Sequence, residues 1–395
     1  MSETTADAAP DQRSRSAERS DSSNAVRGLQ DLGQSVWLDD LRRSLFTSGE
    51  FLRLVTEDGL RGVTSNPSIF EKAIVGSADY TDLLQSDRAG RTPMEMYEAL
   101  AIRDIRDAAA LLRPAYDATG RADGYASLEV SPYVAHDTAA TIKEARRLHK
   151  AVDRDNVMIK VPATAEGVPA VRQLVSEGIN VNITLLFGIE RYAEVAHAYI
   201  EGLSIFVGRG GDPRKVASVA SFFVSRIDTM VDDMLTKRIV TVTDDGVRTA
   251  LTALLGTVAI ANAKLAYQRY LTICRTPEWQ RLASAGAHPQ RLLWASTSTK
   301  NPRYGDVRYV EELIGRDTIN TMTPATIEAF RDHGRLRATL EENVDAARET
   351  LAALARIGIS LDHVTDRLVE DGVRAFSKAF DTLLAGLGNR DSGRA

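Results

Sequence analysis

The sequence predicts an α/β fold, a single (β/α)8 barrel with helical insertions and an extra helical segment at the C-terminus. Short runs of β-branched and aromatic residues alternate eight times with stretches of helical periodicity, which favours parallel strands closed into a barrel. An open doubly wound sheet usually stops at about six strands, and no GxGxxG pattern follows the first run. The length of 395 residues suits one barrel with insertions.

The eight predicted strands are runs of five to nine residues, most of them rich in Val, Ile, Phe, Trp and Thr. In chain order they are residues 34–40, 62–67, 125–130, 156–163, 181–187, 217–225, 291–298 and 317–323. The sequence between them carries helix signals. Residues 138–152, for example, place apolar side chains at helical spacing.

Two stretches exceed what a barrel repeat needs. Residues 201–215 are rich in glycine and include Asp-Pro, which indicates a loop, whereas residues 242–289 read as extra helices. The last stretch, residues 340–387, predicts two long helices that pack across one end of the barrel. The barrel domain is therefore expected to span residues 28–388.

The two chain ends have a different composition. Residues 1–27 and 389–395 are rich in small, polar and charged residues, so we expect tails that bury too little apolar surface to order. The N-terminus also lacks the apolar stretch of a signal peptide. A soluble, cytoplasmic protein is the default expectation.

Composition narrows the classes of function. Basic residues number 49 and acidic residues 54, and a net charge of −5 argues against nucleic-acid binding. No apolar run approaches the ~20 residues of a membrane span. Cys274 is the only cysteine, which excludes a disulfide within the chain and a cysteine-based zinc site.

Lys160 is the most informative single residue. Only nine of the 49 basic residues are lysines, and this one lies in the apolar run VMIKVPA, within a predicted strand. Burial disfavours the charged ammonium, and a neutral amine is the nucleophile that imine-forming enzymes use. An ion pair with a carboxylate on a neighbouring strand would explain the same lysine without any chemistry.

Active sites of such barrels lie at the carboxyl ends of the strands. Polar residues occur at or near every predicted strand end. They are Asp39, Asp40, Thr64, Ser65, Asn66, Glu129, Lys160, Asn182, Thr184, Ser221, Arg226, Ser296, Thr297, Ser298, Lys300, Asn320 and Thr321.

Three motifs in order make a resemblance specific. GLRGVTSNPSIF at residues 59–70 resembles the first signature of the transaldolase family. NVMIKVPAT at residues 156–164 resembles its second signature, which contains the Schiff-base lysine, and EGINVNITLLF at residues 177–187 resembles the strand that follows. The likeness runs from about residue 34 to 324 and is closest to the longer bacterial type.

The resemblance implies a cytoplasmic transferase of the non-oxidative pentose phosphate pathway. It would move a dihydroxyacetone unit from sedoheptulose 7-phosphate to glyceraldehyde 3-phosphate, giving erythrose 4-phosphate and fructose 6-phosphate. The chemistry would run through a Schiff base and would need no metal and no organic cofactor. Sugar phosphates are the expected partners, and a homo-oligomer is left open.

The resemblance also assigns catalytic roles, residue by residue. Lys160 would attack the C2 carbonyl of the ketose. Glu129 would be the general acid and base, acting through a water that Thr184 also holds. Asp39 would take the proton from the C4 hydroxyl when the carbon–carbon bond breaks.

The remaining matches concern substrate binding. Thr64, Asn66, Ser127 and Asn182 would hold sugar hydroxyls. Ser221, Arg226 and Ser296 would bind the phosphate, and Lys300 is expected to join them, because Ser298 stands where simpler members have an arginine.

One ambiguity concerns the phosphate strand, since SIFVGRG at residues 204–210 also resembles it. We assign residues 221–226 instead, because SRID leads into a helical pattern.

Simpler explanations remain for several of these residues. Asp39 could cap the following helix, although Asp40 is the better candidate for that cap. Glu129 could be only a structural partner of Lys160, and Asn182 and Thr184 could satisfy each other in a polar core. Arg226 could lie on the surface of the next helix. Lys72 is expected to be solvated and without function.

Two other functions compete with transfer. One is a free aldolase on the same scaffold, acting on fructose 6-phosphate, but Glu129 and the chain length favour transfer. The other is a non-catalytic barrel that only binds a partner. That reading would be favoured had Lys160, Glu129 or Asp39 been replaced by an inert residue, and none is.

Overall fold

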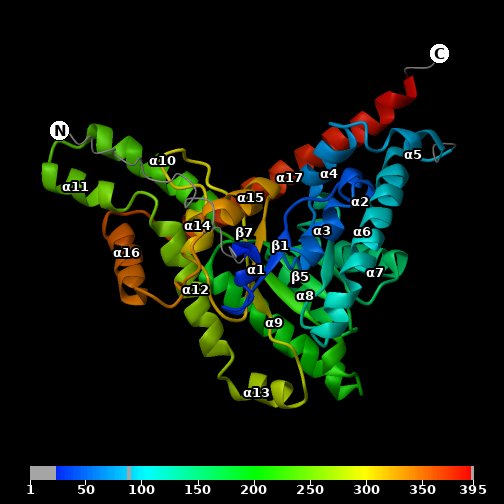
Figure 1. Cartoon of the computed structure of the whole chain (residues 1–395). Helices are drawn as coiled ribbons and strands as arrows, with labels where there is room; N and C mark the ends of the chain where they lie inside the picture. The colour runs from blue at the N-terminus through cyan, green and yellow to red at the C-terminus, as the bar shows by residue number, and fades with distance from the viewer. Residues whose placement is uncertain (1–23, 87–89, 393–395) are drawn as a thin grey trace, which may run out of the picture.

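The computed structural model describes residues 24–86 and 90–392, and its centre is a closed barrel of eight parallel strands (Figure 1). Each strand pairs with the next in the chain, and β8 closes on β1. The strands are β1 Gln34–Leu38, β2 Gly62–Thr64, β3 Tyr125–Glu129, β4 Val157–Pro162, β5 Val181–Leu186, β6 Ser218–Phe223, β7 Arg291–Ala295 and β8 Thr318–Met322. The predicted fold class is confirmed, and every strand lies inside its predicted range.

Helices surround the barrel and connect its strands (Figure 1). Those up to β5 are α1 Ala25–Gly28, α2 Arg43–Thr47, α3 Glu50–Thr56, α4 Pro67–Ile74, α5 Thr81–Ser86, α6 Pro93–Ala118, the 3-10 helix η1 Pro132–Val134, α7 Thr138–Val152 and α8 Gly167–Val175. Those after β5 are α9 Ile189–Gly208, η2 Pro213–Lys215, α10 Ser225–Thr241, α11 Asp245–Ala253, α12 Val258–Ile273, α13 Pro277–Ser284, α14 Arg308–Glu311, α15 Pro324–His333, α16 Val344–Arg356 and α17 Leu361–Ser392.

The strands are buried on both faces, which explains why successive side chains of strands such as β4 and β7 are apolar. Polar side chains break the pattern at alternate positions, as in Ser127 and Glu129 of β3 or Asn182 and Thr184 of β5. Side chains two residues apart on a strand share a face. A polar layer therefore fills the carboxyl-terminal half of the barrel interior.

The amino-terminal end of the barrel is closed by a buried ionic cluster. Asp123 precedes β3 and accepts hydrogen bonds from Ser35 Oγ and, at 2.8 Å, from Trp37 Nε1. Its carboxylate also lies 3.4 Å from the Arg291 guanidinium. A buried cluster at this end serves stability, since catalysis in these barrels occurs at the other end.

The two insertions differ in how well the sequence predicted them. Residues 242–289 contain the extra helices α11, α12 and α13, as expected. The predicted loop at residues 201–215 is wrong, because α9 continues to Gly208 and only the short turn before β6 is irregular. Leu203 is fully buried there, so apolar packing overrides the glycines that suggested a loop.

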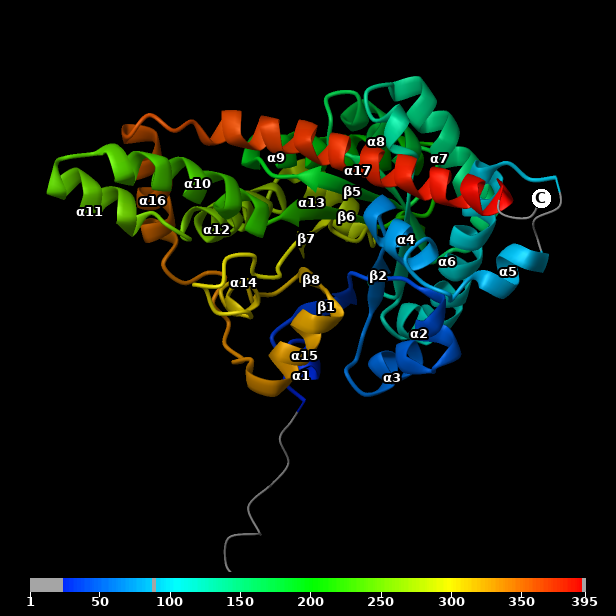
Figure 2. The ribbon, with the colours of Figure 1, turned by 90° about the horizontal axis from the view of Figure 1, so that it is seen from above.

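The C-terminal segment forms two helices, as predicted. The second, α17, crosses the molecule as a long rod, packing against α4, α6, α10 and β5 (Figure 2). Its Phe376 reaches the cavity at the carboxyl end of the barrel, and Phe380 packs edge-on against Tyr97 of α6. This helix therefore forms part of the wall of that cavity.

The ends of the ordered fold fall outside the predicted limits of 28 and 388. Residues 24–27, predicted to be part of a tail, belong instead to the fold: Val26 of α1 is fully buried, and Asn24 caps that helix. At the other end the backbone of α17 remains helical to Ser392. The rest of the predicted tails, residues 1–23 and 393–395, lie outside the described residues.

Among the described residues, no single helix is long and apolar enough to cross a membrane. The pair Asp245–Ala253 and Val258–Ile273 passes that test together, but it is bent by 53°.

Candidate active site

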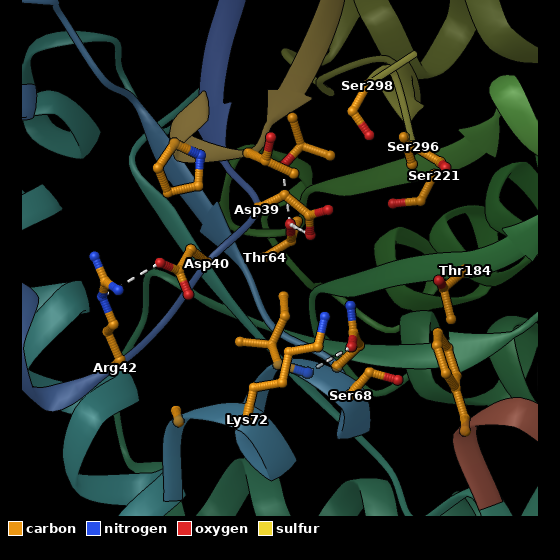
Figure 3. Close-up of a pocket in the computed structure, with 18 of the residues that line it drawn as sticks. Asp39, Asp40, Arg42, Thr64, Ser68, Lys72, Thr184, Ser221, Ser296 and Ser298 are labelled. Carbon is orange, nitrogen blue, oxygen red and sulfur yellow. Dashed lines mark hydrogen bonds and ion pairs between the residues drawn. The ribbon is translucent and has the colours of Figure 1, made fainter. Parts of the chain in front are cut away.

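A cavity of about 600 Å³ opens at the carboxyl ends of the strands (Figure 3). Nine of the twelve predicted site residues line it. They are Asp39, Thr64, Asn66, Lys160, Thr184, Ser221, Arg226, Ser296 and Lys300. The other three, Glu129, Ser127 and Asn182, are buried and contact residues of the lining rather than the cavity itself.

Lys160 and Glu129 form a buried pair. The register of β3 and β4 sets the two residues opposite each other, and their side chains are 4% and 5% exposed. Lys160 Nζ lies 3.1 Å from Glu129 Oε2 and donates a hydrogen bond of 2.7 Å to the carbonyl oxygen of Ser65. The structural ion pair is therefore present, and the amine also lines the cavity, where a ligand can reach it.

Burial raises the pKa of Glu129, because the loss of hydration outweighs the attraction of the Lys160 ammonium. A carboxyl in this state accepts a proton more readily than one in water. With the proton on Glu129, a neutral amine would stand beside a neutral acid, and these are the nucleophile and the general acid that imine formation requires.

Thr184 faces the same region from β5 (Figure 3). Its Oγ1 is buried and has no hydrogen-bond partner in the described part of the chain, which is uncommon for a buried hydroxyl. The pairing of β5 with β6 shifts between Ile183 and Leu186, and Leu185 has a φ of 55°. Such a bulge re-aims neighbouring side chains, and here it accompanies a threonine left without a protein partner.

The carboxylate of Asp39 lies at the end of β1. Thr64 Oγ1 donates to it at 3.1 Å and also lies 2.8 Å from Thr321 Oγ1. Burial raises the pKa of Asp39, although Lys160 and the bond from Thr64 act in the opposite direction. A carboxylate with raised basicity at the cavity wall is suited to accept a proton.

The expectation that Asp40 caps the next helix is wrong, and Asp39 does not cap it either. Helix α2 begins after Arg42, whose side chain makes no capping bond. The Asp40 carboxylate instead lies 3.5 Å from the Arg42 guanidinium at the rim of the cavity (Figure 3). Two residues separate Asp40 from the helix, so its oxygens do not reach the first free amides.

A chain of hydrogen bonds crosses three strands below the cavity. Ser221 Oγ of β6 donates to Asn182 Oδ1 at 2.7 Å, and Asn182 Nδ2 donates to Ser127 Oγ of β3 at 3.1 Å. The expectation that Asn182 and Thr184 satisfy each other is therefore wrong. These hydrogen bonds fix the orientation of Ser221, which is the residue of the three that lines the cavity.

Asn66 has a structural duty in addition to its predicted one. Its side-chain oxygen caps α4 by accepting from the amide of Ile69 at 3.0 Å, and Pro67 occupies the first helical position. The Asn-Pro-Ser motif is thus a helix start at the edge of the cavity.

Arg226 and Lys300 mark the cationic end of the cavity. Arg226 follows β6 in the first turn of α10, yet it points inward, with its guanidinium 5.1 Å from the centre of the Phe223 ring. Burial lowers its pKa, and within the described residues no carboxylate lies at ion-pair distance from it. Lys300 Nζ donates to Ser298 Oγ at 2.7 Å, and desolvation followed by the charge of Arg226 lowers its pKa.

Ser296 completes this end from β7. Its φ of 56° is unusual for serine, and its Oγ lies 3.0 Å from Ser225 Oγ. The alternative phosphate strand at residues 204–210 lies at the end of α9, where Arg209 is exposed. The choice of Ser221 and Arg226 thus agrees with what lines the cavity.

Lys72 is exposed, as expected, but it also lines the cavity from α4, which was not predicted. The signal was its spacing, since residues 69, 72, 73 and 76 follow the capping Asn66 on one side of a helix. Among residues 24–86 and 90–392, no three His, Cys, Asp or Glu side chains gather as metal ligands would.

Comparison with known proteins agrees with this geometry. The family model described as Transaldolase/Fructose-6-phosphate aldolase matches residues 36–387. The chain is 47% identical to "Transaldolase" of Trichodesmium erythraeum over 367 residues, which are 92% of this chain and 97% of that protein. It is 48% identical to "Transaldolase 2" of Nostoc punctiforme over 93% of this chain and 97% of that one. It is also 48% identical to "Transaldolase" of Thiobacillus denitrificans, over 92% and 100%. The chain therefore belongs to the transaldolase/fructose-6-phosphate aldolase family.

Proposed function

We propose that this enzyme is a transaldolase that carries the dihydroxyacetone unit on Lys160, from sedoheptulose 7-phosphate to glyceraldehyde 3-phosphate. The products are erythrose 4-phosphate and fructose 6-phosphate. The observation that carries the proposal is the buried amine of Lys160, 3.1 Å from the Glu129 carboxylate, at the wall of a polar cavity. The family membership and the transaldolase relatives support the same reaction.

The first step is imine formation. Lys160, after passing its proton to Glu129, attacks the C2 carbonyl carbon, and the carbonyl oxygen takes a proton to give a carbinolamine. Loss of that hydroxyl as water, with a proton supplied from Glu129, gives the iminium. Thr184, with its unpartnered hydroxyl beside this region, is suited to hold the water that relays the proton.

The second step breaks the C3–C4 bond. Asp39 takes the proton of the C4 hydroxyl, the C4–O electrons form an aldehyde, and the electrons of the broken bond move into the iminium to give an enamine. The raised pKa of Asp39 makes it a stronger base than a carboxylate in water. The aldehyde product leaves, and the enamine attacks the acceptor aldehyde by the reverse sequence.

The cationic end of the cavity supplies recognition. Arg226, Lys300, Ser221 and Ser296 present donors without a carboxylate partner, as a phosphate monoester requires. Thr64 and Asn66 line the same cavity and are suited to hold the sugar hydroxyls. Asn182 and Ser127 would contribute indirectly, because their hydrogen bonds hold the Ser221 hydroxyl in place.

Release of free dihydroxyacetone is the competing outcome on this scaffold, since the matched family includes fructose-6-phosphate aldolases. Transfer is favoured by Glu129, whose carboxylate stands beside the imine nitrogen. We further propose a cytoplasmic location, where sugar phosphates are interconverted.

The test combines trapping with a transfer assay. Borohydride reduction in the presence of fructose 6-phosphate, followed by peptide mass analysis, should place the adduct on Lys160, and Lys160→Met should abolish both adduct and activity. A coupled assay with paired donor and acceptor sugars should give much faster turnover than donor alone. An adduct on another lysine would overturn the mechanism, whereas equal rates with and without acceptor would favour the aldolase.

A further inference from the structure

Lys72 is a charged side chain of the cavity to which the mechanism gives no role. It extends from α4 into the cavity, between Asp40 on one side and Thr184 on the other (Figure 3). The residue is exposed, and within the described residues its ammonium has no hydrogen bond and no ion pair. A long cation held toward a cavity without a protein partner is a candidate ligand for an anion.

The other charges of the cavity are largely paired. Lys160 faces Glu129 at 3.1 Å, and Arg42 faces Asp40 at 3.5 Å. The Asp79 carboxylate accepts from the backbone amide of Ser44 at 3.1 Å.

Three cations remain without a carboxylate contact in the described part of the chain. They are Arg226 from the start of α10, Lys300 from the segment after β7, and Lys72 from α4. Desolvation, then the charge of Arg226 and, more weakly, that of Lys72 lower the pKa of Lys300, while Asp39 acts in the opposite direction. Asp39 therefore offsets part of the repulsion among the cations that share this cavity, and a bound anion would offset more of it.

We propose that Lys72 is a third cationic ligand of the substrate phosphate, reaching it from the α4 wall of the cavity. This inference rests on the proposed function, because it takes the phosphate site of Arg226 as given. A phosphate monoester carries a charge between about −1.5 and −2 at pH 7 and offers three acceptor oxygens, one for each cation. Lys72 is thereby a binding residue that helps to select phosphorylated over neutral sugars.

The experiment compares two acceptors, glyceraldehyde 3-phosphate and unphosphorylated D-glyceraldehyde, with sedoheptulose 7-phosphate as the donor, so that the released erythrose 4-phosphate differs from both acceptors. In a ping-pong reaction, kcat/KM for the acceptor does not depend on the donor step, so the ratio of the two kcat/KM values measures recognition of the phosphate. Lys72→Met should lower this ratio roughly 10-fold, as expected for one charge-assisted hydrogen bond. Inhibition by inorganic phosphate, competitive with the acceptor, should weaken by a similar factor.

Two matched variants serve as controls. Lys150→Met removes an equal charge from an exposed position on α7, outside the cavity lining, and should keep the wild-type ratio. Lys72→Arg keeps the charge and should restore most of the ratio. A Lys72→Met ratio within twofold of wild type, or an equal loss with both acceptors, would overturn the inference.

Arg226→Ala, measured in the same assay, separates this inference from the proposed function. If Arg226→Ala lowers the ratio and Lys72→Met does not, the phosphate site stands and only the role of Lys72 is wrong. If neither variant lowers it, the phosphate site itself is misplaced.

Discussion

Glu129 Oε2 lies 3.1 Å from Lys160 Nζ because β3 and β4 pair in a register that sets the two residues opposite each other. Their separation is thus fixed by backbone hydrogen bonds rather than by a flexible loop. Removing one partner of a buried ion pair costs far more than replacing both by apolar residues, because the remaining charge stays buried without a counter-charge. The same contact holds the amine in place and provides the acid that imine formation requires.

Glu129→Gln should lower kcat by about 10²–10⁴, because the amide neither accepts the lysine proton nor returns it. Part of the imine should still form, so borohydride trapping at Lys160 should be slowed but detectable. The measurement is the amount of Lys160 adduct in samples quenched with borohydride at timed intervals, together with the steady-state rate. An unchanged rate would remove Glu129 from the mechanism.

Asp39→Asn should separate imine formation from cleavage. Asp39 lies on β1, and its proposed task is the C4 hydroxyl, so the variant should still form the borohydride adduct with fructose 6-phosphate at a rate near that of wild type. Transfer should fall by about 10²–10⁴, because no base takes the C4 proton. Loss of trapping and transfer in equal proportion would place Asp39 in the imine step instead.

The acid limb of the pH profile should lie above the ordinary range for an aspartate. Burial raises the pKa of Asp39 above its usual value of 3.8, and the base must be ionised to accept a proton. As pH falls through that raised pKa, kcat/KM should therefore fall earlier than for a solvated carboxylate. The pKa of Glu129 is raised too, so its titration would overlap with that of Asp39. The acid limb of kcat/KM is therefore best measured in the Glu129→Gln variant. A midpoint at or below 3.8 in that variant would contradict the assignment of Asp39 as the base.

The barrel and the buried lysine were predictable because both depend on local patterns. Alternating strand and helix signals determine the closed sheet, and a lysine within an apolar strand stands out in a chain that uses arginine for most positive charges. The strand-end rule then brought Asp39, Thr64 and Arg226 to one cavity.

What escaped prediction depends on tertiary packing. The glycines near residue 208 suggested a loop, but burial of Leu203 keeps α9 helical to that point. Asp40 was expected to cap a helix that begins further along the chain. Lys72 lies on an exposed helix face, as expected, but the sequence does not reveal that this face of α4 borders the cavity.

Arg226→Ala should raise KM for phosphorylated substrates by roughly 10- to 100-fold, since a charge-assisted contact to the phosphate is lost. Arg209→Ala is the matched control, because Arg209 occupies the similar SIFVGRG motif but lies exposed at the end of α9. Its KM should stay at the wild-type value. The reverse order of effects would show that the phosphate strand is the other one.

Asp123→Ala should lower the free energy of unfolding by about 3–5 kcal/mol without touching the cavity. The substitution leaves the Arg291 guanidinium, 3.4 Å away, and the Trp37 Nε1–H group without their acceptor in a buried site. The control is Asp117→Ala, which breaks an exposed ion pair with Arg113 and should change the free energy of unfolding far less. Denaturant unfolding measures both, and Lys160 trapping in the folded fraction should persist in each variant. A similar loss of unfolding free energy in both variants would mean that the cluster at the amino-terminal end does not stabilise the barrel. If the folded Asp123→Ala variant no longer forms the Lys160 adduct, the two ends of the barrel are coupled.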